Sequence, residues 1–382
     1  MTLMLASAVD AAEADVAARL GADIVDLKVA RRGAIGALPL ETVRAAVAAA
    51  AQLSETSATF GDPPYEPSAF RERAEALIDI GVDYLKLAVD GEALAALSST
   101  LSRFAGRTKF VGLMFADRSP DFGFLTELKG LGFKGAMLDT SDKALGGLLA
   151  HLDIKRAAEF VDRCHELSLF AALAGSLEAP DVPRLSLIKP DVLGFRGALC
   201  QDQDRRKGID PQAVALIRRL IPPARLPADT SHKIDWRLLA RGLVGGRERE
   251  ADVDTVYVHG FQIAADVGAY GHERGRPQRL AFDVEAAVSR SSHGADEMSE
   301  VFSYDVILDA IRLVLGRGHA NFLETVAENV AEIVLADSRV RSVTVNVRKL
   351  DIVEGAVGVT IRRARESIAT ASRFAGFAVP SE

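Results

Sequence analysis

Eight short apolar runs recur through roughly the first 220 residues, and this repeat limits the possible folds more than any other feature. The runs lie at residues 2–8, 23–29, 56–60, 83–89, 109–116, 135–140, 169–175 and 192–198. Helical patterns such as AAEADVAARL and KRAAEFVDRCHEL separate most of them. Eight strands alternating with helices predict a (β/α)8 barrel. An open, doubly wound sheet is the weaker alternative, because no GxGxxG or P-loop follows the first run.

The pattern changes after IPPARLPADTSHKIDW at 221–236, a segment rich in proline and polar residues. Two long strand patterns follow at 254–270 and 278–289, then two helical patterns at 303–318 and 322–337, and two more strands at 341–350 and 355–363. The order ββααββ predicts a small antiparallel α+β domain. We therefore expect a barrel over 1–222, a linker over 223–249, an α+β domain over 250–363 and a tail over 364–382.

Composition excludes several classes of function. The net charge of the 382 residues is −7 with no long basic run, which argues against nucleic acid as a partner. The two cysteines form neither a metal motif nor a disulfide framework, which is typical of a reducing cytoplasm, and the seven histidines show no HxxxH or HxH pairing. We expect no metal. No apolar run approaches the roughly 20 residues that span a bilayer, and the apolar start is too short for a signal peptide.

Charged residues cluster where the predicted strands end, which is where barrels of this class carry their functional groups. Asp26 and Lys28 close the second run, and their spacing of two puts both on one face of a strand. Lys86 lies in the fourth run, and Asp139 ends the sixth, with Lys143 four residues later. A lysine with a lowered pKa can form a Schiff base, and a neighbouring aspartate can orient it and move protons. A structural ion pair is the alternative for any one Asp–Lys pair.

Small residues end the seventh and eighth runs, in the segments AGS and FRGA. Such loops often bind phosphate through exposed backbone N–H groups, and we expect Gly175, Ser176, Arg196 and Gly197 to contact a substrate phosphate. A small sugar phosphate is therefore the predicted substrate. A non-catalytic sensor of phosphate metabolites is another possibility, but the clustered lysines argue against it.

Six motifs in residues 1 to about 220 resemble (5-formylfuran-3-yl)methyl phosphate synthase, or 4-HFC-P synthase, a family of methanofuran biosynthesis: ADIVDLKVARRGAIGA, SATFGDPPYEP, DYLKLAV, AMLDTSDK, AALAGS and GFRGALC. The resemblance implies a lyase without a cofactor. It would condense two molecules of glyceraldehyde 3-phosphate into a phosphorylated furan aldehyde, with loss of phosphate and water. It further implies that Lys28 or Lys143 forms the Schiff base, while Lys86, Asp26 and Asp139 transfer protons and position groups.

Residues 250–363 resemble dihydroneopterin aldolase, on the motifs GAYGHERGRPQRLAFDVE, VFSYDVI, FLETVAENVAE and VTVNVRKL. That family has the tunnelling fold and forms rings with sites between subunits, so the resemblance implies a homo-oligomer. It would convert dihydroneopterin to 6-hydroxymethyl-dihydropterin and glycolaldehyde. Glu324 matches the pterin anchor, which as a carboxylate can accept two hydrogen bonds. Tyr304 and Lys349 match proton-transfer residues, and Glu273 matches an acidic position.

Two interpretations of the whole chain follow. The leading one is a bifunctional cytoplasmic enzyme, whose two products feed one-carbon cofactors. In the alternative only the barrel is catalytic and the C-terminal domain is an oligomerisation scaffold. Leu350, which follows Lys349 where the aldolase family usually has proline, favours the alternative.

Overall fold

The computed structural model describes residues 2–29, 35–221, 253–270, 273–289, 301–353 and 355–365. These residues form two compact units, one on each side of the gap at 222–252. The predicted linker at 223–249 and residues 366–382 of the predicted tail lie outside the described residues, so the domain boundaries stay predictions. Within the described ranges, no helix is both long and apolar enough to cross a membrane.

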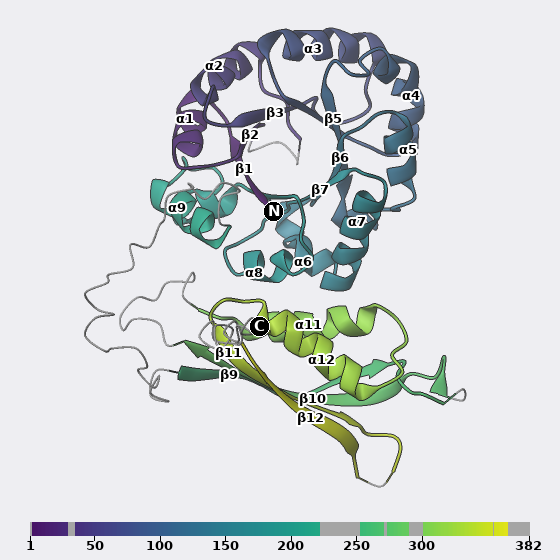
Figure 1. Ribbon diagram of the computed structural model, residues 1–382. Helices are drawn as coiled ribbons and strands as arrows, with labels where there is room; N and C mark the ends of the chain where they lie inside the picture. The colour runs from purple at the N-terminus through teal and green to yellow at the C-terminus, as the bar shows by residue number, and fades with distance from the viewer. Residues whose placement is uncertain are drawn as a thin grey trace, which may run out of the picture. The chain divides into compact units, whose positions relative to one another are not determined.

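The first unit is a closed barrel of eight parallel strands with helices around it (Figure 1). The strands are β1 (Leu3–Ala8), β2 (Ile24–Leu27), β3 (Glu55–Thr59), β4 (Tyr84–Ala88), β5 (Lys109–Phe115), β6 (Gly135–Asp139), β7 (Phe170–Leu173) and β8 (Val192–Phe195). Each strand pairs with the next, and β8 pairs with β1 and closes the ring. The predicted (β/α)8 barrel is confirmed.

Helices follow the strands in the alternation that the sequence predicts. They are α1 (Ala11–Arg19), α2 (Leu40–Ala50), α3 (Pro67–Ile80), α4 (Gly91–Ser102), α5 (Phe124–Gly130), α6 (Leu148–His151), α7 (Ile154–Glu166), α8 (Asp181–Ser186) and α9 (Pro211–Leu220). Asp10, Asp90 and Asp153 cap α1, α4 and α7 by accepting a backbone N–H three residues on, which fixes where each helix begins. Short 3-10 turns follow some strands: η1 (Ala116–Arg118), η2 (Lys143–Leu145), η3 (Gly197–Leu199) and η4 (Gln201–Gln203).

Alternate residues of each strand point into the barrel, and this period of two separates an apolar interior from a polar mouth. Leu5, Ile24, Met137 and Val192 belong to one buried apolar cluster inside the barrel. Two residues further along their strands, the same faces carry Ser7 on β1, Asp26 on β2 and Asp139 on β6, all buried. The polar groups therefore meet at the carboxyl ends of the strands.

The second unit is a four-stranded antiparallel sheet in the order β12-β11-β10-β9, with two helices on one face (Figure 1). Its elements are β9 (Val253–Ala265), β10 (Gln278–Ser289), α11 (Tyr304–Gly316), α12 (Leu323–Leu335), β11 (Val340–Lys349) and β12 (Val357–Ala364). Val326, Val330 and Val334 recur at helical spacing on α12 and are buried, which gives this unit its own apolar core. The predicted ββααββ order is confirmed.

Candidate functional site

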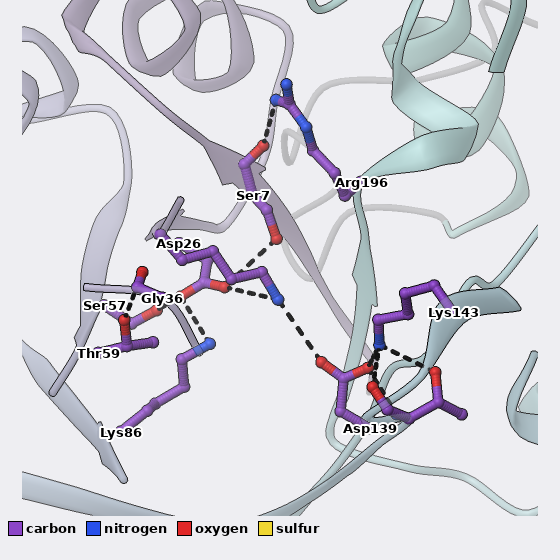
Figure 2. Close-up of polar contacts among 11 residues, drawn as sticks. Ser7, Asp26, Gly36, Ser57, Thr59, Lys86, Asp139, Lys143 and Arg196 are labelled. Atoms are coloured by element: carbon purple, nitrogen blue, oxygen red, sulfur yellow. Dashed lines mark hydrogen bonds and ion pairs between the residues drawn. The ribbon is translucent and has the colours of Figure 1, made fainter. Parts of the chain in front are cut away.

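Five charged side chains form an alternating chain at the mouth of the barrel (Figure 2). Lys86 Nζ lies 2.6 Å from Asp26 Oδ1, and Asp26 Oδ2 lies 3.6 Å from Lys28 Nζ. Lys28 Nζ is in turn 3.5 Å from Asp139 Oδ2, and Asp139 Oδ1 pairs with Lys143. The structure thus brings together these five predicted site residues, with two carboxylates between three amines.

Burial of the chain of charges decreases from one end to the other. The exposed fraction of the side chain is 2% for Lys86, 8% for Lys28 and 17% for Lys143, and it is at most 2% for both aspartates. Buried charges are tolerated when each faces an opposite charge, as every member of this cluster does. A small molecule would therefore approach from the side of Lys28 and Lys143.

The cluster shifts the pKa values of its own members. Burial acts to raise the pKa of the Asp26 carboxyl, but Lys86 and Lys28 outweigh it, and the pKa lies below its ordinary value. Burial is likewise outweighed at Asp139, where Lys28 and Lys143 hold the pKa down. Burial lowers the pKa of Lys86 and of Lys143 despite their carboxylate partners. The carboxylates therefore stay ionised at neutral pH, while these two amines lose a proton more easily than a surface lysine.

Hydroxyl groups on the neighbouring strands hold the carboxylate of Asp26. Ser57 Oγ donates to Asp26 Oδ1 at 2.6 Å, and Ser7 Oγ donates to Oδ2 at 3.3 Å. Both serines are direct register partners of Asp26, Ser7 on β1 and Ser57 on β3. Neither serine was among the residues predicted from the sequence, although polar residues at the ends of two adjacent predicted strands were a usable signal.

Asp117, in η1 after β5, fixes the loop that carries Lys143. Its carboxylate accepts hydrogen bonds from Ser141 N at 2.8 Å, Ser141 Oγ at 2.6 Å and Asp142 N at 2.9 Å. Burial acts to raise the pKa of Asp117, but these donors lower it to about 2. Asp117 was likewise not predicted from the sequence, because nothing in the local pattern near residue 117 indicates a partner 24 residues away.

A cavity of about 250 Å³ opens above Lys28, Asp139 and Lys143 and extends to the loops after β7 and β8. Its lining includes the predicted phosphate-binding residues Gly175, Ser176, Arg196 and Gly197. Gly194 on β8 and Ala174 both line the cavity, and they are packed closely: a Cβ at position 194 would lie only 3.1 Å from the Cβ of Ala174. Neither Asp26 nor Lys86 is among the described residues that line the cavity, so both act from beneath its floor.

Arg196 borders the cavity, but its guanidinium is engaged within the protein. Nη1 and Nη2 donate to the Glu13 carboxylate at 2.5 and 3.2 Å, and Nη1 also donates to the Ser7 carbonyl at 3.1 Å. The remaining donors contact the carbonyls of Arg205 and Lys207. The geometry thus gives Arg196 a clamping role that joins β1, α1 and the loop after β8, and leaves it few means to bind a substrate phosphate.

The second unit contains one complete ion pair among the predicted residues. Lys349 Nζ donates to Glu273 Oε1 at 2.6 Å, Gln278 Nε2 donates to the same oxygen at 3.0 Å, and Tyr270 N donates to Oε2 at 3.0 Å. The bond from Lys349 lowers the pKa of Glu273 to about 2. The side chain of Lys349 therefore contacts Glu273, although Leu350 stands after it where the aldolase family usually has proline.

Tyr304 and Glu324 are exposed, in the first turns of α11 and α12. Within the described residues, no hydrogen bond or ion pair joins either of them to Glu273 or Lys349. The connection before α12 contacts the turn that holds Glu273, because Gly268 N donates to Ala320 O at 2.9 Å. Glu324, in the first turn of α12, is thus on the same side of the unit as the turn that holds Glu273. Tyr304 is the first of the 13 residues of α11, so a helix length of roughly 20 Å separates it from the connection between α11 and α12.

Fold and site together define a (β/α)8-barrel protein with an amine–carboxylate centre at its mouth, followed by a ββααββ unit. Residues 4–218 match the family model described as 4-HFC-P synthase, and the chain belongs to that family. Residues 256–362 match the model described as dihydroneopterin aldolase. Both resemblances stated from the sequence are confirmed.

Individual relatives each match one part of the chain. A candidate (5-formylfuran-3-yl)methyl phosphate synthase of Methylorubrum extorquens is 42% identical over 206 residues, which cover 53% of this chain and 84% of that protein. The (5-formylfuran-3-yl)methyl phosphate synthase of Methanopyrus kandleri is 33% identical over 223 residues, which cover 54% of this chain and 92% of that protein. An E. coli dihydroneopterin aldolase, solved in complex with neopterin, is 28% identical, with a TM-score of 0.27 over 29% of this chain and 99% of that one.

Proposed function

We propose that the barrel condenses two molecules of glyceraldehyde 3-phosphate into (5-formylfuran-3-yl)methyl phosphate through a lysine Schiff base. The observation that carries this proposal is the alternating chain of amines and carboxylates beneath one cavity. Two three-carbon phosphates supply the six carbons of the product, and the loss of one phosphate and two waters balances the reaction. The step is a condensation with eliminations and requires no oxidant.

Lys28 is the amine best suited to form the imine. It borders the cavity, and its Nζ lies 3.6 and 3.5 Å from two carboxylates, longer than a charged hydrogen bond. Lys86 is held by Asp26 beneath the cavity, and Lys143 by Asp139 and Thr140. A carbonyl carbon can therefore reach Lys28 without breaking a short contact. Protonated, the imine is an electron sink for carbon–carbon bond formation and for the eliminations.

The two aspartates that flank Lys28 suit the proton transfers. Asp139 borders the cavity, so it can take a proton from the substrate and share it with Lys143, while Asp26 beneath the floor can exchange a proton with Lys28 or Lys86. Asp139 and Lys143 also line the cavity, which suits them to the elimination of water and phosphate there. Hydrolysis of the final imine would release the aldehyde and restore Lys28.

Reduction with borohydride in the presence of glyceraldehyde 3-phosphate, followed by peptide mapping, tests this mechanism. We expect a label on the peptide that contains Lys28, lost in Lys28→Met and retained in Lys129→Met, a change at an exposed lysine. A label on Lys143 would mean that Lys143, and not Lys28, forms the imine. If no lysine is labelled while furan is still formed, the Schiff-base mechanism is wrong.

For the second unit we propose dihydroneopterin aldolase activity at a site shared between copies of the chain. Lys349 would act as the base, oriented by Glu273, and Glu324 would anchor the pterin. Since Tyr304 lies at the far end of α11, it would come from a neighbouring copy, which makes the protein a homo-oligomer. The 2.6 Å contact of Lys349 with Glu273 favours this activity over the scaffold alternative.

Incubation of the purified protein with dihydroneopterin, with detection of glycolaldehyde, separates the two interpretations of this unit. Release of glycolaldehyde supports the aldolase, while intact furan synthesis without it supports the scaffold. The two products would then supply a methanofuran-type and a pterin-type cofactor. A cytoplasmic location completes the proposal, and the two free, buried cysteines are compatible with a reducing compartment.

A further inference from the structure

The loop after β8 carries a partly buried arginine, Arg205, whose buried Nε has no hydrogen-bond partner within the described residues. Its charged neighbours pair with each other, Arg206 with Asp204 at 2.7 Å and Lys207 with Asp202 at 2.5 Å. Between them, the guanidinium of Arg205 forms no hydrogen bond or ion pair within the described residues, and its Nε is buried. Because a buried, unpaired donor costs free energy, this group is one that a bound anion would satisfy.

Arg205 lines the cavity together with backbone of the loops after β7 and β8. Ser176, Leu177, Gly197 and Ala198 line the same region, and their N–H groups find no acceptor among the described residues. Backbone N–H groups and an arginine in one concave region are the usual components of a phosphate site. Of the described lining residues, Glu178 and Asp139 carry the carboxylates; Glu178 is exposed, and Asp139 is paired with lysines.

Arg196, at the start of this loop, holds the backbone of Arg205 in place. Arg196 Nε and Nη2 donate to the Arg205 carbonyl at 3.3 and 3.1 Å, and Nη2 donates to the Lys207 carbonyl at 3.2 Å. The same guanidinium is fixed by Glu13 on α1. The buried arginine therefore fixes the backbone of the loop, and the side chain of Arg205 stays available for a ligand.

We propose that Arg205 binds the phosphate group of the substrate, together with backbone N–H groups after β7 and β8, and that Arg196 positions it. The identity of the ligand as a triose phosphate rests on the proposed function. Bound in this way, the phosphate would lie at the β7–β8 side of the cavity, while the carbonyl end extends towards Lys28 and Lys143. Arg205 would then select phosphorylated substrates over unphosphorylated ones.

The full-length Arg205→Met variant tests this assignment, with Arg206→Met as its matched control. The two changes remove the same charge from adjacent positions, but Arg206 is 71% exposed and already paired with Asp204. In titration calorimetry with inorganic phosphate, we expect Arg205→Met to weaken binding about 10- to 100-fold, the worth of charged hydrogen bonds. The KM for glyceraldehyde 3-phosphate should rise by a similar factor. Arg206→Met should resemble the wild type in both measurements.

Phosphate binding that is equal in Arg205→Met and the wild type would overturn the proposal, as would an equal loss in Arg206→Met. Arg205→Lys guards against a folding artefact: it keeps the charge, and its phosphate affinity should lie between those of the wild type and Arg205→Met. Calorimetry needs no turnover. Phosphate binding that depends on Arg205, in a protein that does not consume glyceraldehyde 3-phosphate, would refute the furan synthase and leave the phosphate site standing.

Discussion

The two candidate sites differ in how much of each a single copy of the chain supplies. At the barrel mouth, five charged side chains meet, three of them from β2, β4 and β6 and two from the segments after β2 and β6, and each charge faces an opposite one. In the second unit, of the predicted site residues Glu273, Tyr304, Glu324 and Lys349, only Glu273 and Lys349 bond to each other within the described part of the chain. Tyr304 is 58% exposed and lies a helix length away.

The architecture of each unit explains this difference. A closed barrel brings the ends of all its strands to one rim, so residues as distant in sequence as 26 and 143 can share a cluster. An open sheet has two edges, and the edge strands β9 and β12 are largely exposed here. A site in such a unit can be completed by another copy. We therefore expect the barrel to work within one chain and the second unit to depend on assembly.

The largest expected effect is the loss of furan synthesis in Lys28→Met. Without an amine there is no imine, and the rate should fall about 10³-fold or more. The barrel should stay folded, because Asp26 and Asp139 keep Lys86 and Lys143 as partners. Formation of the furan aldehyde, followed by its absorbance, measures the effect.

Glycolaldehyde release from dihydroneopterin serves as the control for Lys28→Met and should not change. Lys349→Met should do the reverse, with furan synthesis intact and pterin cleavage reduced about 10²- to 10⁴-fold. If either variant abolished both activities, the two sites would not be independent.

A mixing experiment tests whether the second site is shared between copies. Tyr304→Phe and Lys349→Met should each be weak alone in pterin cleavage. If Tyr304 and Lys349 come from different copies, random reassembly of an equal mixture restores about one quarter of the sites. Glycolaldehyde release after dissociation and reassembly measures the recovery, and the same mixture should show unchanged furan synthesis.

No recovery on mixing, with each variant correctly assembled, would put both residues in one copy and remove the contrast between the units. Recovery is expected only for pairs of variants on opposite sides of the interface. Glu273→Gln mixed with Lys349→Met should therefore stay inactive, because these two side chains touch within one chain.

Much of the fold and part of the site could be predicted from the sequence. The eight apolar runs predict the eight barrel strands. This works because side chains repeat every 2 residues in a strand and every 3.6 residues in a helix, and both periods are visible in a short stretch of sequence. Asp26, Lys28, Lys86, Asp139 and Lys143 were found because they lie at or near strand ends, and barrel topology brings those ends together.

Contacts made by loops could not be predicted in this way. Arg196 and Arg205 both follow the eighth strand. Only the three-dimensional contacts show that the guanidinium of Arg196 is fully paired, while that of Arg205 has no partner among the residues the structure describes. Asp117 likewise bonds to a loop 24 residues away, which no periodic pattern encodes. Partner choice in loops depends on which groups remain unpaired after the regular elements form.

A smaller effect is expected for Asp117→Asn. This variant sharpens the contrast between the two sites, because it should change the activity of the barrel and leave that of the second unit unaltered. The variant weakens the bonds that fix the loop of Lys143, so kcat for furan synthesis should fall about tenfold, with KM less affected. The pH profile should also shift, since Lys143 is less firmly held against Asp139. Asp121→Asn, at an exposed carboxylate that bonds only to Gly123 N among the described residues, is the matched control.

An unchanged pH profile with a uniformly lower rate would show that Asp117 only stabilises the fold and does not position Lys143. Pterin cleavage by the same preparation gives the internal reference, because Asp117 belongs to the other unit. A loss of both activities would indicate that the units are coupled.

The smallest expected effect is the pH dependence of the stability that Asp117 provides. The donors lower its pKa from 3.8 to about 2 in the folded protein, so the unfolded state binds more protons between these two values. The stabilisation is complete above pH 3.8 and is lost as the pH falls through about 2. Wild type and Asp117→Asn should therefore differ on the order of 1 kcal/mol in the free energy of unfolding of the barrel at neutral pH, with solvent screening included. Denaturant titrations at a series of pH values should show this difference shrinking in acid; a difference that persists at pH 2 would mean that the Asp117 carboxylate is not its source.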